Sequence, residues 1–516
     1  MQGRLIHPWG GSPQVFAWVT LGCGIACTSE TAALPLASDF LNGGEDDTAA
    51  EVDTDPVDSA DPAHTGVPDS GEDDTASDDA DGDGYLPPED CDDTDPLVSP
   101  EAEEICDNGQ DDNCDGLSCR WDGAGIGRLT GGRNDSAGVG VAVGDFSGDG
   151  APDVIIGAPD ATGSSRAGRV WVWSGTSVAD ASLESSATDL GPSDGADGAG
   201  RIVVVPGDLS GDRMVDLVVG TNHVPGESAG RLSVLLGPLV PDTRLAEPDA
   251  WIELPLDLDL LLFPAGGPAT DSGSGLLLGA PAEGGGVVRL LEGSWSGLRT
   301  LDEATVTWTA AAGQAGRAVL SGGDLNGDGL DDVLIGVPGS EQAGLFFGPH
   351  ASGAVEDADA WLGVASTNGG LGTSLALPGD VDGDGAVDVL VAEAVDAGDR
   401  GLVVLFCGGD RAECARWTGA VDNDQLGHAL TSVHDTEGDG HAEVVLTAHG
   451  SGTMGLWFGP IAGSHTLETA DVSVTLGGQA GFSIAASSGR LAIGAPTLGS
   501  EDPPTGGAIL LDFPSL

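Results

Sequence analysis

The sequence predicts an all-β fold for most of its 516 residues, specifically a seven-bladed β-propeller. A glycine opens a similar unit at six places, and one long interval leaves room for a degenerate unit, which gives seven units of roughly 57 residues. Each unit consists of short apolar runs separated by Gly and Pro, which is typical of buried strands, and four strands per unit is the pattern of a propeller blade. The six glycines are Gly138, Gly200, Gly316, Gly372, Gly427 and Gly481.

The fourth unit shows the expected strands most clearly. Its four strands are expected at residues 317–320, 332–338, 344–348 and 360–362. The seventh unit ends after its third strand, at residues 508–513, so a closed ring needs an outer strand from elsewhere. Residues 125–130, just before the first unit, are placed to supply that strand.

The composition excludes some classes of function. The net charge is −67, and all 17 basic residues are Arg. No basic stripe is available to displace counterions from phosphates, so a nucleic-acid partner is excluded. No apolar stretch reaches the roughly 18 residues of a membrane-spanning helix. The acidity favours oxygen-rich sites that attract hard cations.

Three further segments precede the repeats. The first resembles a secretory leader, in which Cys23 or Cys27 is a candidate for lipid attachment and simple cleavage is the alternative. The second is acidic, without Lys or Arg, and cannot bury enough apolar surface to offset its ordering entropy. The expected boundaries are a leader at 1–27, a disordered acidic linker at 28–78, a metal-binding module rich in Asp and Cys at 79–119, and the propeller at 120–516.

The module begins with a spacing of acidic residues that is typical of a calcium loop. Side-chain oxygens occur at positions 1, 3, 5 and 12, Gly84 stands at position 6, and a backbone carbonyl serves at position 7. Alternate oxygens recur later in the module, so one or two Ca²⁺ ions are expected there. The candidate ligands are Asp79, Asp81, Asp83, Tyr85 and Asp90 in the first loop, and Asp111, Asn113 and Asp115 in the second.

Four cysteines, Cys91, Cys106, Cys114 and Cys119, lie among these acids. With the acidic segments around them they resemble the MopE-type metal-binding motif of bacterial surface proteins. Two disulfides of open connectivity are favoured over a thiolate metal site, because no CxxC pair occurs and the acids prefer hard cations. The resemblance implies copper for one relative, which the lack of a His and Met cluster does not favour here.

Five of the seven repeats carry an acidic nonapeptide between their first two strands. Oxygens at positions 1, 3, 5 and 9, with the carbonyl at position 7, surround one Ca²⁺ ion, and Gly at position 6 permits a left-handed turn. Arg213 replaces that Gly in the second unit, which adds backbone strain and a positive charge. The candidate ligands are Asp145, Ser147, Asp149 and Asp153; Asp208, Ser210, Asp212 and Asp216; Asp324, Asn326, Asp328 and Asp332; Asp380, Asp382, Asp384 and Asp388; and Asp435, Glu437, Asp439 and Glu443.

Two units lack this nonapeptide, so about five calcium ions are expected in the propeller. The third unit keeps one carboxylate over residues 267–275, and the seventh shortens to residues 487–489. Both are expected to be empty of metal.

The acidic loops and the Gly-Ala-Pro segments after several second strands resemble FG-GAP repeats of the integrin-α type. Such segments stand at residues 157–159, 279–281 and 494–496, although the Phe-Gly element is eroded. The resemblance spans residues 120–516. It implies a seven-bladed propeller with calcium loops on one face and ligand contacts on the opposite face.

No catalytic constellation accompanies the metal loops. Two matches to G-x-S-x-G, at residues 191–195 and 226–230, do not follow a strand and open a helix, as a nucleophile elbow does. Cys407 and Cys414 are expected to close a local loop as a disulfide, with free thiols as the alternative.

These features predict an exported, calcium-binding scaffold of the bacterial cell surface that binds a protein or glycan ligand and is not an enzyme. It is expected to be monomeric, to use no cofactor other than calcium, and to touch the membrane only through an N-terminal lipid anchor. Two alternatives stay open. One is a surface metal-binding or storage protein that works through residues 79–119, and the other is a hydrolase that uses the propeller channel.

Overall fold

The computed structural model describes the propeller and parts of the preceding module. The described residues are 81–82, 84–87, 90–92, 94–100, 102, 114 and 126–513, with gaps at 162–167, 176–179, 192–197, 221–229, 241–242, 255–262, 271–272, 365–369, 394–399, 410, 434, 437, 478 and 499–504. The expected leader and linker lie outside these residues. So do the candidate ligands Asp79, Asp83, Asp111, Asn113, Asp115 and Glu437, and the cysteines Cys106 and Cys119.

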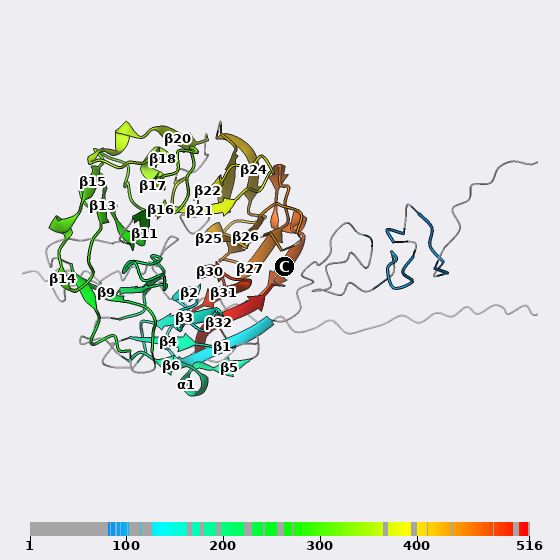
Figure 1. Ribbon diagram of the computed structural model, residues 1–516, viewed down its shortest axis with the longest axis horizontal. Helices are drawn as coiled ribbons and strands as arrows, with labels where there is room; N and C mark the ends of the chain where they lie inside the picture. Colours follow the sequence, from blue (N-terminus) through cyan, green and yellow to red (C-terminus); the bar gives the residue numbers. More distant parts are fainter. Residues whose placement is uncertain are drawn as a thin grey trace, which may run out of the picture.

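Seven antiparallel sheets form a ring of blades around a central axis, as the sequence predicts (Figure 1). The strands of blades 1 to 4, from the axis outward, are β2 (Gly140–Gly144), β3 (Asp153–Ala158), β4 (Arg169–Trp173) and β6 (Thr188–Asp189); β7 (Ile202–Val204), β8 (Leu217–Gly220), β9 (Arg231–Leu235) and β10 (Ala250–Glu253); β11 (Phe263–Thr270), β12 (Gly273–Ala280), β13 (Val287–Leu291) and β15 (Val306–Thr309); and β16 (Val319–Ser321), β17 (Val333–Val337), β18 (Gln342–Phe346) and β20 (Ala360–Gly363).

The remaining three blades follow the same order. Their strands are β21 (Ser374–Gly379), β22 (Asp388–Glu393), β23 (Leu402–Cys407) and β24 (Ala412–Thr418); β25 (Leu426–Val433), β26 (Glu443–Ala448), β27 (Thr453–Trp457) and β29 (Val472–Thr475); and β30 (Ser483–Ser487), β31 (Arg490–Ala495) and β32 (Thr505–Asp512). Helical turns are short: α1 (Leu183–Ser186), η2 (Leu301–Glu303), η3 (Pro338–Ser340), η4 (Val355–Asp357) and η5 (Leu467–Thr469). Among the described residues, no helix combines the length and apolar character needed to cross a bilayer.

The ring closes with a strand from before the first blade, which confirms the prediction. β1 (Ile126–Arg133) pairs antiparallel with β32 and is the outer strand of blade 7, with Ile126 opposite Leu511 and Thr130 opposite Gly507. Figure 1 shows β1, near the start of the propeller, beside β32 at its end. The two ends of the propeller are therefore hydrogen-bonded to each other in one sheet.

Four short strands extend a blade's sheet with a segment from the next blade. β5 (Ala181–Ser182), β14 (Gly297–Arg299), β19 (Gly353–Ala354) and β28 (Gly463–His465) each pair parallel with the outer strand of the preceding blade. They link blades 1 to 7, 3 to 2, 4 to 3 and 6 to 5 through backbone hydrogen bonds at the outer edge of the ring.

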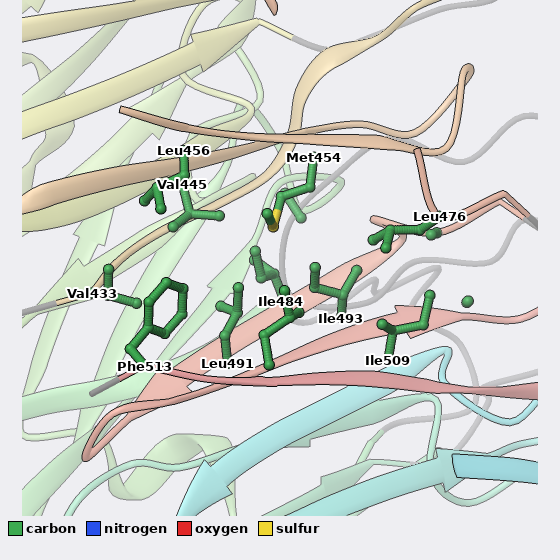
Figure 2. Packing of buried hydrophobic residues seen from close by; sticks show 14 of the residues in the cluster. Val433, Val445, Met454, Leu456, Leu476, Ile484, Leu491, Ile493, Ile509 and Phe513 are labelled. Carbon is green, nitrogen blue, oxygen red and sulfur yellow. The ribbon is translucent and has the colours of Figure 1, made fainter. Parts of the chain in front are cut away.

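The hydrophobic core lies between blades rather than within them. Seven buried clusters each combine residues of two neighbouring blades, one cluster for each junction of the ring. Figure 2 shows the junction of blades 6 and 7, where Met454 and Leu456 face Ile484, Leu491 and Ile509. Because aromatic residues are few, Val, Leu, Ile and Ala supply most of this packing.

Close backbone contacts between blades explain the Gly of the Gly-Ala-Pro segments. Gly157, on the second strand of blade 1, lies against Gly200, which opens blade 2. A Cβ atom on Gly157 would stand 1.9 Å from the Gly200 carbonyl oxygen, so any side chain there would force the blades apart. The same contact recurs between Gly336 and Gly372.

Candidate functional site

The five acidic loops lie on one face of the ring. Each joins the inner strand of a blade to the second strand, in blades 1, 2, 4, 5 and 6, so all five stand at the same end of the sheets. We name each loop by its blade. Nineteen of the twenty candidate ligands of these loops are described, Glu437 being the exception, and each set lies in the connection between two neighbouring strands of one blade. Among the described residues, three acidic side chains gather within 4.8 Å of one another in loop 5 alone.

The first Asp of every loop is held by three backbone N–H groups. In loop 5, one carboxylate oxygen of Asp380 accepts hydrogen bonds from the N–H groups of Gly383 and Asp384 at 2.7 and 3.1 Å, and the other accepts one from Gly385 at 2.8 Å. The same three contacts are made by Asp145, Asp208, Asp324 and Asp435. These N–H donors lower the pKa of Asp324, and in Asp208 they outweigh the raising effect of burial on the pKa.

The turn requires a left-handed residue at position 6, as the sequence predicts. Gly150 has φ +89° there, and its equivalents in loops 4, 5 and 6 are also glycines with positive φ. Arg213 adopts the same conformation in loop 2, with φ +73°. A left-handed residue with a side chain costs about 1–2 kcal/mol, so loop 2 carries the strain that its sequence indicates.

The ninth residue of each loop is a buried acid. Asp216, Asp332 and Asp388 each accept backbone N–H bonds from their own loop and from a glycine that follows the third strand. Burial raises the pKa of Asp216 and Asp388 to about 6 and that of Glu443 to about 7, and nearby loop acids add to the effect. A bound cation would offset both the burial and the repulsion.

The donor atoms of these loops fit a hard cation. In loop 5, carboxylate oxygens of Asp380, Asp382 and Asp384 all lie within 4.8 Å of one another. The Ser147 hydroxyl in loop 1 and one carboxylate oxygen of Glu443 in loop 6 are buried without a hydrogen-bond partner in the described structure. A Ca²⁺ ion is coordinated by several oxygen atoms, so converging carboxylates and buried oxygens without a hydrogen-bond partner are the features expected of a calcium site.

Blades 3 and 7 have no acidic loop. In blade 3, β11 and β12 pair up to Thr270 and Gly273, so a hairpin replaces the nonapeptide. In blade 7, Ser488 and Gly489 form a two-residue turn in which both have positive φ. The shortening expected in the seventh unit is thus confirmed, whereas residues 267–270 and 273–275 of the third unit, which align with a nonapeptide in the sequence, belong to the paired strands β11 and β12. That both units are empty of metal stays a prediction.

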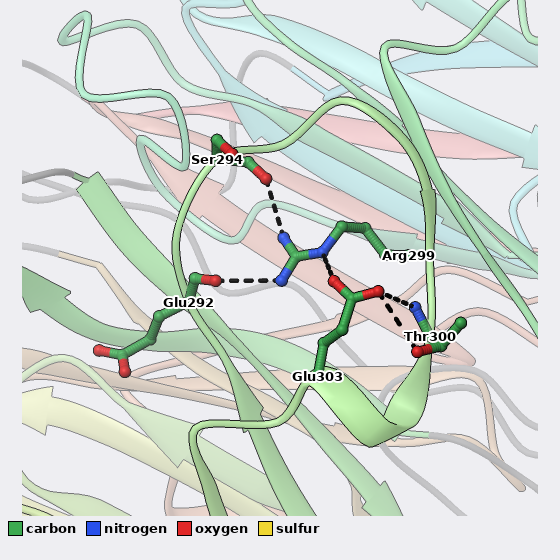
Figure 3. Close-up of polar contacts among 5 residues, drawn as sticks. All are labelled: Glu292, Ser294, Arg299, Thr300 and Glu303. Carbon is green, nitrogen blue, oxygen red and sulfur yellow. Dashed lines mark hydrogen bonds and ion pairs between the residues drawn. The ribbon is translucent and has the colours of Figure 1, made fainter.

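An arginine stands on the loop face of each of these two blades, which the sequence reasoning missed. In blade 3, Arg299 donates to the Glu303 carboxylate at 2.5 Å and to the carbonyls of Ser294 and Glu292 (Figure 3). Its guanidinium also lies 4.8 Å from the ring centre of Trp295. In blade 7, Arg490 is the first residue of β31, the place taken in blade 5 by Asp388. For Arg490, its alignment with position 9 was the available signal; Arg299, the last residue of β14, carried no such signal.

The described part of the Asp/Cys module has one disulfide and one buried acid. Cys91 bonds to Cys114, with 5.5 Å between the Cα atoms. Asp90, at position 12 of the expected calcium loop, is buried; one of its oxygens accepts the Asp92 N–H, and the other has no hydrogen-bond partner there. Gly84 at position 6 has φ +104°. In the propeller, the expected disulfide between Cys407 and Cys414 is present.

Comparison with protein families agrees with both resemblances. The FG-GAP repeat model matches residues 137–173 and 315–355, in blades 1 and 4. A family described as a "Putative metal-binding motif", of the MopE type, matches residues 90–118. The chain thus contains FG-GAP repeats on a seven-bladed propeller and a MopE-type motif before it.

Similar curated proteins are integrin alpha subunits. The chain is 28% identical over 144 residues to integrin alpha-4 of Xenopus laevis, 29% over 158 residues to integrin alpha-PS2 of Drosophila melanogaster, and 27% over 155 residues to integrin alpha-IIb of Homo sapiens. Each match covers 25 or 26% of this chain and 11 to 15% of the relative. The chain therefore spans only a small part of these relatives.

Proposed function

We propose that this chain, with its FG-GAP repeats on a seven-bladed propeller, is a calcium-stabilised scaffold of the cell surface that binds a protein ligand. The observation that carries the proposal is the set of five acidic loops in register on one face, each with its first acid in the same backbone cage. The face opposite these loops is the one we assign to the ligand. A glycan is a second class of ligand on the same face.

Calcium is the proposed ion because the donors are hard oxygens. The loops offer carboxylates, a hydroxyl, an amide and backbone carbonyls, which suit Ca²⁺ rather than metals that prefer nitrogen or sulfur. The sulfur of Cys407 lies near the acids of loop 5, but it is part of a disulfide and is not a thiolate. We propose one ion for each of the five loops and one or two for the module at 79–119.

The ligand-binding role is supported by the integrin alpha subunits that the propeller resembles. We also propose that the chain is extracellular and that residues 1–27 are a leader, with or without a lipid on Cys23 or Cys27. The same proposal includes that the propeller is monomeric and has no enzymatic activity.

A second candidate function is metal storage through the module. It is supported by the match to the MopE-type motif and by the unpartnered oxygen of the buried Asp90. Metal analysis of the full chain and of an Asp90→Asn variant separates the two: a storage role requires that this substitution remove most of the exchangeable metal, whereas a propeller scaffold keeps about five ions.

Affinity capture tests the scaffold proposal. The full chain is immobilised and exposed to surface proteins and to a glycan array, in calcium and in EGTA. We expect specific partners that are retained in calcium and released by EGTA. A chain that binds no calcium, or partners that are insensitive to its removal, would contradict the proposal.

A further inference from the structure

Arg411 connects two neighbouring acidic loops. It lies in the turn between β23 and β24, with φ +53°, inside the short segment closed by Cys407 and Cys414. Its guanidinium donates to the Val387 carbonyl at 2.5 Å and to the Leu325 carbonyl. One side chain from blade 5 thus contacts the backbone of loop 5 and, 86 residues earlier in the sequence, the backbone of loop 4.

Both carbonyls belong to residues next to candidate ligands. Leu325 follows Asp324, and its N–H donates to the ninth-position acid Asp332 at 2.7 Å. Val387 directly precedes Asp388, the ninth-position acid of loop 5. A shift of either carbonyl would move an acid that surrounds the cation site. The guanidinium is planar and rigid, so it fixes the two carbonyls relative to each other.

The disulfide turn also forms a wall of loop 5. The Gly408 N–H donates to Asp388 at 3.1 Å, and the Cys407 sulfur, the Asp382 carboxylate and the Asp388 carboxylate have atoms within 4.8 Å of one another. The Cα atoms of Cys407 and Cys414 are 5.8 Å apart. Arg411 holds a left-handed conformation that costs free energy for a residue with a side chain, and such strain persists only where the surroundings impose it.

We propose that Arg411 is a positioning residue that couples loops 4 and 5, so that a cation bound in one loop raises the affinity of the other. The inference rests on the proposed calcium sites. A loop that has bound its ion is ordered. Because the guanidinium also holds a carbonyl of the neighbouring loop, that second loop is partly ordered as well and loses less conformational entropy when it binds its own ion.

The positive charge of Arg411 lowers the affinity of both loops for Ca²⁺, which opposes the gain from positioning. A guanidinium near the sites repels Ca²⁺, so its removal would raise affinity if charge alone mattered. Lys keeps the charge but has a single ammonium on a flexible stem and cannot hold two carbonyls in a fixed plane. Arg411→Lys and Arg411→Met therefore behave alike if positioning dominates, whereas a charge effect would leave Arg411→Lys like the wild type.

The test is calcium titration of the full chain by calorimetry. We expect Arg411→Met and Arg411→Lys to weaken two of the sites about five- to tenfold. The other three propeller sites, unchanged, report that the variant is folded. Asp382→Asn/Asp384→Asn, which removes loop 5 ligands, should weaken loop 4 in the wild type but not in Arg411→Met. Arg400→Gln, an exposed arginine of the same blade that pairs with Asp422, is the control.

Each outcome decides one claim. If the wild type binds no calcium, the proposed function fails before the coupling is reached. If the wild type binds calcium and Arg411→Met gives the same isotherm, or if loop 4 ignores the loss of loop 5, the coupling is overturned and the calcium sites stand. A Cys407→Ala/Cys414→Ala variant should reproduce the Arg411→Met isotherm, since it frees the turn that carries Arg411.

Discussion

Arg490 and Asp512 form a two-pronged ion pair at the junction where the ring closes, with N···O distances of 2.6 and 2.7 Å. Arg490 is buried and also donates to the carbonyls of Pro152 and Gly175 in blade 1, at 2.9 and 2.7 Å. Its guanidinium lies 5.3 Å from the ring centre of Trp173. Blade 7 has no acidic loop, and the positively charged side chain of Arg490 at its loop face thus connects it to blade 1.

The first prediction concerns this closure. Arg490→Met should lower the free energy of unfolding by about 2–4 kcal/mol, because it leaves Asp512 and two carbonyls without their donor. Urea denaturation in calcium and in EGTA should give the same loss, since Arg490 acts without a bound ion. Arg400→Met, at an exposed ion pair, is the matched control and should cost less than about 1 kcal/mol. A loss seen only in calcium would contradict this role.

The second prediction concerns metal removal. EGTA should lower the melting temperature of the full chain by at least about 5 °C, because several acids then repel one another without a compensating ion. Asp388→Asn should narrow this difference and reduce the bound calcium by one ion, measured by calorimetry and metal analysis. Asp302→Asn, at an exposed acid in η2, should leave both unchanged. Equal melting temperatures in calcium and EGTA would remove the basis for the metal sites.

The features predicted correctly from the sequence are those with a local signal. The acidic loops are nine residues long, so the left-handed conformation of the sixth residue, as at Gly150 and Gly385, follows from the spacing alone. The closing strand followed from counting: blade 7 lacked a fourth strand, and β1 supplies it. The disulfide of Cys407 and Cys414 spans seven residues and was equally local.

The features that escaped prediction depend on partners far away in the sequence. Arg490 contacts Pro152, 338 residues away, and Arg411 contacts Leu325 across a blade junction. Nothing in the surrounding sequence indicates either partner, because such contacts arise only once the ring is closed. The parallel edge strands, such as β28 beside β24, are three residues or fewer and carry no periodic pattern that could be recognised.

The third prediction concerns acid. His449 stacks on His428 with ring centres 4.5 Å apart, and burial lowers the pKa of His449 to about 4. The unfolded chain binds this proton near pH 6.5, so the folded state loses stability as the pH falls from about 6.5 to about 4, by about 2–3 kcal/mol in total. His449→Gln should remove this part of the loss.

Other groups titrate in the same range with the opposite sign. Burial raises the pKa of Asp135 to about 6 and that of Glu443 to about 7, so their contributions to stability fall as the pH rises through those values. The measurement is therefore the difference between wild type and His449→Gln in urea titrations at each pH. A difference that stays constant from pH 7 to pH 4 would show that His449 does not titrate in the folded protein as its burial requires.

The fourth prediction concerns Arg201, which follows Gly200 at the end of blade 2 that faces away from the acidic loops. Its side chain is buried, and its Nε atom has no hydrogen-bond partner in the described structure. Burial lowers the pKa of Arg201 to about 10, and the charge of Asp160 only partly opposes this. A buried charge that is only partly compensated costs stability, so Arg201→Met should raise the free energy of unfolding by about 1–2 kcal/mol.

Chemical denaturation in calcium measures this gain, and Arg299→Met is the informative comparison. Arg299 is equally buried but has a carboxylate and two carbonyls as acceptors, so its removal should destabilise the protein. If the two variants change the free energy of unfolding in opposite directions, the difference follows from the acceptors around each guanidinium, since the replaced side chain and the substitution are the same. If Arg201→Met also destabilises the chain, packing of the Arg201 stem outweighs the cost of its charge, and the prediction is wrong.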